Sequence, residues 1–261
     1  MNLQDFRCIG VSLLVAVGSV SLGLSAAEPT VAQGANTAEL KTVDAVIQRF
    51  VEAIGGETAV RKLTQRTTKG SLELQQQGVS VELKVESKAP NKRLTTIILP
   101  GGAGELATGF DGTAAWRSIP VQGVVDLTGD EARSTKEESN FWEVVDFKSA
   151  YSKLELKGIT KVAGAECYLI EATPAGGKTQ KVYFSKQNGL IVRRDSEAPT
   201  LTGSMAPTET YFEDYRTVDG MKMAFKMRRT LPEDFAFTFV TSEVNHATPI
   251  ADSRFKKPET K

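Results

Sequence analysis

The chain contains very few of the residues that most often carry catalysis or bind metal ions. Its 261 residues include two cysteines and a single histidine, His246, which stands near an expected strand end close to the C-terminus. A nucleophile activated by a histidine base needs convergent partners, which this pattern does not suggest. One histidine and Cys167, the single cysteine beyond the N-terminal region, cannot complete the usual zinc ligand set. The sequence therefore predicts no catalytic residue, no metal site and no cofactor.

Neither sign of charge is in excess. The chain has 32 basic and 32 acidic residues. Proteins that bind nucleic acid through its phosphates concentrate basic residues on one surface, so nucleic acid is not an expected partner. A hydrophobic content of 40% and a charged content of 25% are typical of a globular protein whose stability comes from its core.

The one long apolar run lies at the N-terminus. Ile9 to Leu24 carries no charge, Arg7 precedes it, and Ser25-Ala26-Ala27 offers small residues before Glu28. This order is typical of a secretory signal peptide, and the run is shorter than the ~20 residues that a membrane-spanning helix needs. We therefore expect residues 1–27 to be cleaved, leaving a periplasmic protein without a transmembrane anchor.

The mature chain is expected to hold one domain, residues 38–258, after a flexible segment of residues 28–37. Apolar residues from Leu40 to Ile54 follow helical spacing, with Asn36 and Glu39 as a capping box. A second short helix is expected from Glu57 to Leu63. A third, from Thr135 to Ala150, would have an apolar side that includes Phe141, Trp142, Val145 and Phe147.

From Arg66 onward the spacing of apolar residues changes to two. Val79 to Val85 alternates strictly with polar residues, as in a strand with one solvated face. Asp111-Gly112, Asn188-Gly189 and Asp219-Gly220 each lie between strand-like runs and tolerate the backbone of tight turns. We expect an α+β protein with an antiparallel sheet of about ten strands.

Several short motifs spread over this region are similar to one known family. They are Val51 to Leu63, Lys88-Ala-Pro-Asn-Lys92, Gly109-Phe-Asp-Gly-Thr-Ala-Ala-Trp116, Val182-Tyr-Phe184, Gly189-Leu-Ile-Val192, Asp214-Tyr-Arg-Thr-Val-Asp-Gly220 and Phe255-Lys-Lys-Pro258. With them the chain resembles the outer-membrane lipoprotein-sorting proteins, the LolA/LolB-like family, as a divergent exported subtype. The resemblance implies a strongly curved antiparallel sheet, an incomplete β-barrel covered by a few helices, with an apolar cavity for acyl chains.

Independently of that resemblance, one stretch of the chain indicates an apolar lining. Apolar side chains alternate over residues 221–227 and again over residues 235–239. A hairpin around residues 231–234 would bring Met227 near Phe237 and Phe225 near Phe239. Such a polarisable surface adapts to varied acyl chains, although the same pattern is typical of a core beneath helices. The candidate ligand-binding residues are Met221, Met223, Phe225, Met227, Phe235, Phe237, Phe239 and Trp142.

The sequence thus predicts a non-enzymatic binder or carrier of an apolar ligand in the cell envelope, the ligand being a lipid or a lipoprotein acyl chain. One alternative is an envelope protein–protein interaction or assembly module, whose cavity is filled by its own side chains and holds no lipid. Another is a hydrolase with an unrecognised pair of acids, for which the sequence offers Glu213, Asp214 and Asp219 near a turn. That spacing is also typical of an ordinary solvated turn.

Overall fold

A computed structural model describes residues 39–175, 177–199, 205–232 and 235–259, and all that follows concerns these residues. The chain divides into two units after Thr37, and only the second contains described residues. The expected signal peptide, the flexible segment and Asn36 lie outside the description, so these expectations and the domain bounds stay predictions. In the described ranges, no helix is long and apolar enough to cross a membrane.

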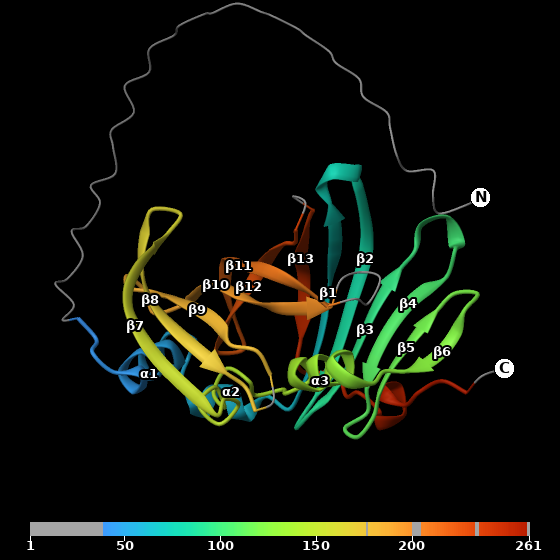
Figure 1. The fold of residues 1–261 in the computed structure, drawn as a ribbon. Helices are drawn as coiled ribbons and strands as arrows, with labels where there is room; N and C mark the ends of the chain where they lie inside the picture. The colour runs from blue at the N-terminus through green and yellow to red at the C-terminus, as the bar shows by residue number, and fades with distance from the viewer. Residues whose placement is uncertain (1–38, 176, 200–204, 233–234, 260–261) are drawn as a thin grey trace, which may run out of the picture. The chain divides into compact units, whose positions relative to one another are not determined.

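The described residues form one antiparallel sheet of thirteen strands, rather than about ten, with few helices (Figure 1). From edge to edge the order is β6 (Gly123–Asp126), β5 (Ala115–Ile119), β4 (Glu105–Phe110), β3 (Lys92–Ile98), β2 (Val79–Lys88), β1 (Gln65–Leu74), β13 (Ala236–Asn245), β12 (Met221–Thr230), β11 (Met205–Val218), β10 (Ile191–Pro199), β9 (Gln180–Ser185), β8 (Ala165–Thr173) and β7 (Lys153–Val162). The sheet is open, with β6 and β7 at its edges. The prediction of an α+β fold with an antiparallel sheet is confirmed, but a strongly curved barrel is not shown.

The first two helices occupy the expected segments. Helix α1 (Val43–Ala53) begins at Thr42, whose hydroxyl accepts a hydrogen bond from the Ala45 amide at 3.1 Å, so the expected capping box at Glu39 does not start it. Helix α2 (Glu57–Lys62) follows two glycines with positive φ. At the same junction, the Lys222 amide donates to the Ile54 carbonyl at 2.8 Å, which ties the end of α1 to β12.

The third helix differs from the prediction. Helix α3 spans Gly129–Glu138, so it begins six residues earlier than expected and does not continue to Ala150. The residues after Ser139 form turns. The Phe141 amide donates to the Pro90 carbonyl at 2.9 Å, so it makes no hydrogen bond that would continue the helix. The aromatic residues that we assigned to a helix are still buried from these turns, with Phe141 and Phe147 7% and 1% exposed.

All three helices lie on one face of the sheet. Val46, Ile47 and Phe50 of α1 pack in the same buried cluster as Ile170 and Val182. From Ile170, direct pairs between strands and steps of two residues along a strand lead across β9–β13 to β1–β4 on the same side of the sheet. Phe110, whose cluster contacts Ala132 of α3, lies on that side. We call this side the helix face.

The opposite face carries the Cys167 side chain in a separate buried cluster. The thiol is free and fully buried, and this burial raises its pKa. A buried thiol with a raised pKa is inert.

A close approach between β4 and β5 gives the Gly109–Trp116 motif a structural role. Gly109 lies directly opposite Trp116, and a Cβ atom at Gly109 would lie 2.4 Å from the indole ring. Trp116 is 2% exposed, and its Nε1 donates to the Phe255 carbonyl at 2.9 Å. The motif therefore holds the C-terminal 3₁₀ turn, Asp252–Phe255, against the face opposite the helices.

Gly109→Ala is expected to lower the free energy of unfolding by about 1–3 kcal/mol, because the buried indole must move to admit the methyl group. Urea unfolding measures this change. Thr108→Ala, one residue away, adds no atom against the ring and serves as the control. A loss below about 0.5 kcal/mol for Gly109→Ala would contradict the proposed close packing.

Candidate functional site

Strands β12 and β13 form the expected hairpin, but in a different register. Met227 lies directly opposite Phe239, and Phe237 lies opposite Arg229, so the predicted pairs of Met227 with Phe237 and Phe225 with Phe239 are wrong. The hairpin closes through a hydrogen bond from the Leu231 amide to the Phe235 carbonyl at 2.8 Å. As a result, each residue of β12 pairs with the β13 residue two positions later than the one predicted.

The actual register creates a continuous strip of apolar side chains on the helix face. Five directly paired residues cross strands β11, β12, β13, β1 and β2, and we call them the apolar row: Phe212, Met227, Phe239, Leu72 and Val81. Leu72 is fully buried, while the other four side chains are partly exposed. The row thus combines one fully buried side chain with accessible apolar surface.

Three phenylalanines extend this surface along β13. The Phe237 and Phe239 ring centroids lie 5.2 Å apart and those of Phe235 and Phe237 lie 6.3 Å apart, both in edge-to-face arrangements. Phe237 is only 2% exposed and anchors the group, whereas its two neighbours keep partial exposure. Four of the predicted lining residues, Met227, Phe235, Phe237 and Phe239, are therefore brought together.

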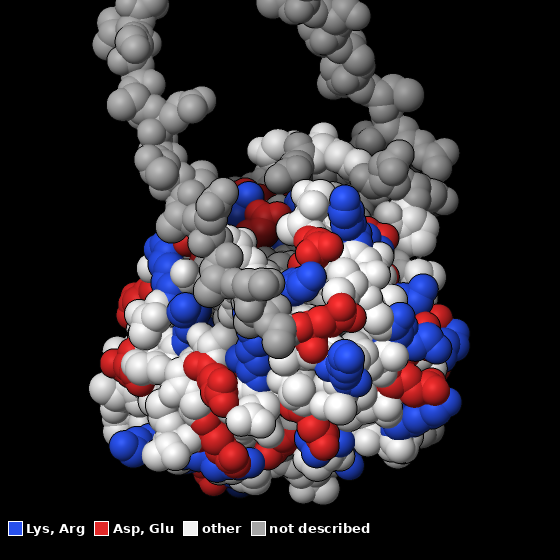
Figure 2. Space-filling view, turned by 90° about the vertical axis from the view of Figure 1, so that its left-hand side faces the viewer, with Lys and Arg blue, Asp and Glu red and all other residues white. Residues whose placement is uncertain are grey.

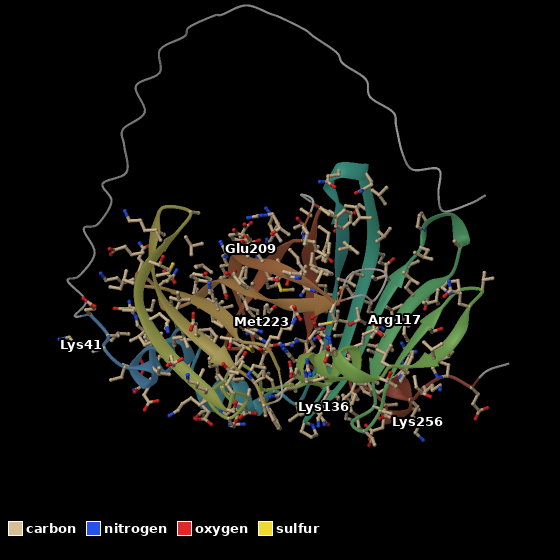
Figure 3. All side chains as sticks on the ribbon, viewed as in Figure 1. Lys41, Arg117, Lys136, Glu209, Met223 and Lys256 are labelled. Atoms are coloured by element: carbon tan, nitrogen blue, oxygen red, sulfur yellow. The ribbon has the colours of Figure 1, made fainter. Side chains whose placement is uncertain are left out.

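The other four predicted residues are placed elsewhere. Met221 is buried in the α1 cluster, and Trp142 packs against that cluster. Met223, which is labelled in Figure 3, also packs against it. The Trp142 indole donates to the Leu63 carbonyl at 3.0 Å, which ties it to the end of α2. Phe225 is buried under the guanidinium of Arg216, 4.6 Å from its ring centroid. None of these four side chains belongs to the apolar row.

Sequence reasoning missed two rows of arginines on the helix face. Arg194 and Arg229 lie on either side of Thr210 in one row of directly paired residues. Arg66 and Arg93 lie on either side of Ser87 in another. We call Arg66, Arg93, Arg194 and Arg229 the arginine set.

The guanidinium groups of the arginine set have few ion-pair or hydrogen-bond partners. Among the described residues, only Arg194 has a carboxylate partner, Glu143, at 2.8 Å. Arg229 donates to the Thr210 hydroxyl at 3.3 Å, and Arg93 donates to the Glu138 carbonyl at 3.4 Å. The guanidinium of Arg66 lies over the Phe141 ring, 5.3 Å from its centroid.

The four charges are close enough to act on one another. Burial, together with the charge of Arg93, lowers the pKa of Arg66 to about 10. Burial also lowers the pKa of Arg229, and the charges of Arg194 and Arg93 act in the same direction. Burial raises the pKa of Glu137 at the end of α3. This part of the helix face therefore concentrates positive charge on partly buried side chains.

On the opposite face of the sheet, the basic side chains are paired with carboxylates. Arg193 donates to both carboxylate oxygens of Asp195 and also pairs with Glu209, between the rings of Tyr183 and Tyr211. Lys226 and Arg228 both pair with Glu213. On the side of the molecule drawn in Figure 2, basic and acidic side chains are likewise interspersed. Arg193, Lys226 and Arg228 therefore lie on the opposite face and are largely neutralised, whereas their neighbour in sequence, Arg194, lies on the helix face.

A surface pocket of about 520 Å³ opens at the ends of strands β9 to β12. Most of its described lining is polar or charged, including Lys178, Glu197, Thr208 and Glu209, and none of the eight predicted lining residues borders it. This pocket is therefore separate from the lining residues that the sequence predicted.

The single histidine is a buried structural residue. The His246 side chain is 5% exposed, and its Nδ1 lies 2.8 Å from a carboxylate oxygen of Asp219 at the β11–β12 turn. Within the described part of the chain, no group of three histidine, cysteine, aspartate or glutamate side chains is placed to hold a metal ion.

A single open antiparallel sheet with its helices on one face defines a known class of fold, and the described chain has the fold of the LolA-like proteins. A LolA superfamily protein from Nitrosomonas europaea matches 84% of this chain and 99% of its own, with a TM-score of 0.56 and 15% identity. A solved domain from Vibrio parahaemolyticus is named for outer membrane lipoprotein sorting. It matches 81% of this chain and 94% of its own, with a TM-score of 0.58 and 15% identity.

A DUF1329 family protein from Desulfovibrio piger is similar to the same degree, matching 82% of this chain and 97% of its own with a TM-score of 0.58 and 17% identity. No family model matches the chain, and no curated protein has a significantly similar sequence. At these identities the comparisons show the fold alone.

Proposed function

We propose that this protein is a non-enzymatic binder or carrier of an apolar ligand in the cell envelope, the ligand being a lipid or a lipoprotein acyl chain. The observation that carries the proposal is the apolar row, which crosses five strands and includes four partly exposed apolar side chains. Met227, Phe239 and the adjacent Phe235 supply the polarisable contact surface. Sharing a fold with a domain named for lipoprotein sorting favours acyl chains as the ligand class.

The strongly curved form of the sheet is part of the same proposal. Helix α3 contacts β4 and β5 and also contacts β10. In the strand order β4 stands third and β10 tenth, which is seven places apart, or about 33 Å in a flat sheet. A helix of ten residues is only about 15 Å long, so these contacts favour a sheet that bends around α3. A bent sheet would make the helix face concave, as a bound chain requires.

The energetics of such a ligand need no reactive group. Each buried methylene contributes up to about 0.8 kcal/mol, before the cost of ordering the chain and the protein. A long acyl chain therefore gains affinity from apolar contact alone. We accordingly assign no catalytic residue and no cofactor to the protein.

The envelope location in this proposal comes from the N-terminal sequence. A cleaved signal peptide over residues 1–27 would deliver the protein to the periplasm, where lipids and lipoproteins cross between membranes. Sequencing the N-terminus of protein from a native export host tests this part, with Glu28 as the expected first residue. An N-terminus that retains residues 1–27 would contradict it.

Titration with a fluorescent fatty acid tests the binding function. A carrier is expected to bind the probe saturably, with about one molecule per protein, and to release it to an excess of unlabelled fatty acid. Absence of saturable binding would contradict the proposal. Together with a stable protein partner in the envelope, that result would favour the interaction module with a self-filled cavity.

A further inference from the structure

We infer that the arginine set binds the anionic head group of the apolar ligand, a carboxylate or a phosphate, beside the apolar row. This inference rests on the proposed function, since the head group is that of the same ligand. It adds a polar specificity to a surface that would otherwise recognise only hydrocarbon.

The two features are adjacent on the same strands. Arg229 lies two residues after Met227 on β12, so both side chains point to the helix face. Across the hairpin, Arg229 pairs with Phe237, which lies two residues before Phe239. Two residues along a strand span about 7 Å. A chain lying on the apolar row would therefore bring its polar end within reach of the arginine set.

Unused hydrogen-bond donors lie in both arginine rows. The Nε atoms of Arg93 and Arg194 are buried and have no hydrogen-bond partner in the described part of the chain, and the same holds for the Ser87 hydroxyl oxygen. Buried polar atoms are normally hydrogen-bonded, so each of these three positions calls for a partner. Guanidinium groups match the two oxygens of a carboxylate or a phosphate, and a hydroxyl adds a further donor.

The charges of the neighbouring groups favour an anion here. Arg66, Arg93 and Arg229 form no ion pair with any described residue, whereas Arg117 on the same face pairs with Glu131 at 3.0 Å. Within the described residues, the elements around the set contribute three carboxylates: Glu143 pairs with Arg194, Glu138 acts on Arg229, and burial disfavours the charged form of Glu137. Four guanidinium groups thus face fewer than four full negative charges, and a bound anion would complete the balance.

The test compares a fluorescent fatty acid with its methyl ester, using the wild-type protein. The two probes share one hydrocarbon chain and differ in a single negative charge. We expect the acid to bind at least tenfold more tightly than the ester at pH 8. Inorganic phosphate alone, measured by calorimetry, is expected to bind weakly or not at all, since the head group gains affinity from its attached chain.

Two variants then assign the preference to the arginine set. Arg93→Gln and Arg229→Gln are each expected to weaken binding of the acid about tenfold and leave binding of the ester unchanged. Arg228→Gln is the matched control, because Arg228 is the neighbour of Arg229 on the opposite face and pairs with Glu213. Arg93→Lys keeps the charge and is expected to retain part of the preference. Circular dichroism and thermal melting establish that each variant is folded.

Each outcome has a definite meaning. Equal wild-type affinity for acid and ester would overturn the head-group site while leaving the proposed function intact, and it needs no variant. Binding of neither probe would overturn both. Tight binding of inorganic phosphate by itself would overturn the head-group assignment in favour of a free anion. Loss of acid binding in Arg228→Gln, equal to that in Arg229→Gln, would also contradict the site.

Discussion

Phe184→Ala is expected to lower the free energy of unfolding by about 3–5 kcal/mol, the largest single effect predicted for this chain. Phe184 on β9 is 1% exposed, and its ring contacts Phe50 at 5.5 Å and Phe147 at 5.8 Å between centroids. It thus joins α1, the turns after α3 and the sheet in one cluster. Removing it leaves a cavity that three separate elements would have to fill.

Urea unfolding, with unchanged dependence on denaturant, measures this loss. Ile98→Ala is the control, because Ile98 is 37% exposed and faces away from the helices. It is expected to cost about 1 kcal/mol or less. A similar small cost for Phe184→Ala would mean that the helices do not depend on this cluster for their position.

Met227→Gln is expected to weaken binding of a fluorescent fatty acid about fivefold or more while the protein remains folded. Glutamine has nearly the shape of methionine, but its amide would face the hydrocarbon chain without a partner, at a cost of about 1–3 kcal/mol. Met227 is suited to this test because it is partly exposed and lies opposite Phe212 and Phe239. Phe237, at 2% exposure, is a poorer choice, since a polar replacement there would affect folding first.

Met227→Leu keeps the apolar character and is expected to bind almost as well as the wild type. Ile98→Gln adds the same amide on the opposite face and is expected to leave affinity unchanged. Normal binding by folded Met227→Gln would contradict a role for the apolar row. Equal loss in Ile98→Gln would point to an indirect effect on the fold.

Local patterns in the sequence were enough to predict much of the sheet. Strict alternation from Val79 to Val85 lies within β2, and the Asp219-Gly220 pair forms the turn between β11 and β12. Two hairpins were harder to predict, because Val121 and Ala163 adopt positive φ at turns without the usual asparagine or aspartate. Unrecognised turns of this kind explain why the strand number was underestimated.

The site could be predicted only in part, because it depends on register and on distant pairing. Alternation identified Met227 and Phe239 as apolar surface residues, but a difference of two residues at the turn decided which partner each one faces. The arginine set joins β1 and β3 with β10 and β12, which are far apart in the chain. Arg66 and Arg229 show no common motif in the sequence, and only the folded sheet relates them.

The most direct test of the carrier function is organic extraction and mass spectrometry of protein purified from the envelope of cells that export it. The proposed function predicts a lipid or acyl species in about equimolar amount, and the arginine set predicts that its head group is acidic. An empty protein that also fails to take up a fluorescent fatty acid would contradict the carrier function. The apolar row would then be core packing, and a protein partner the next ligand to seek.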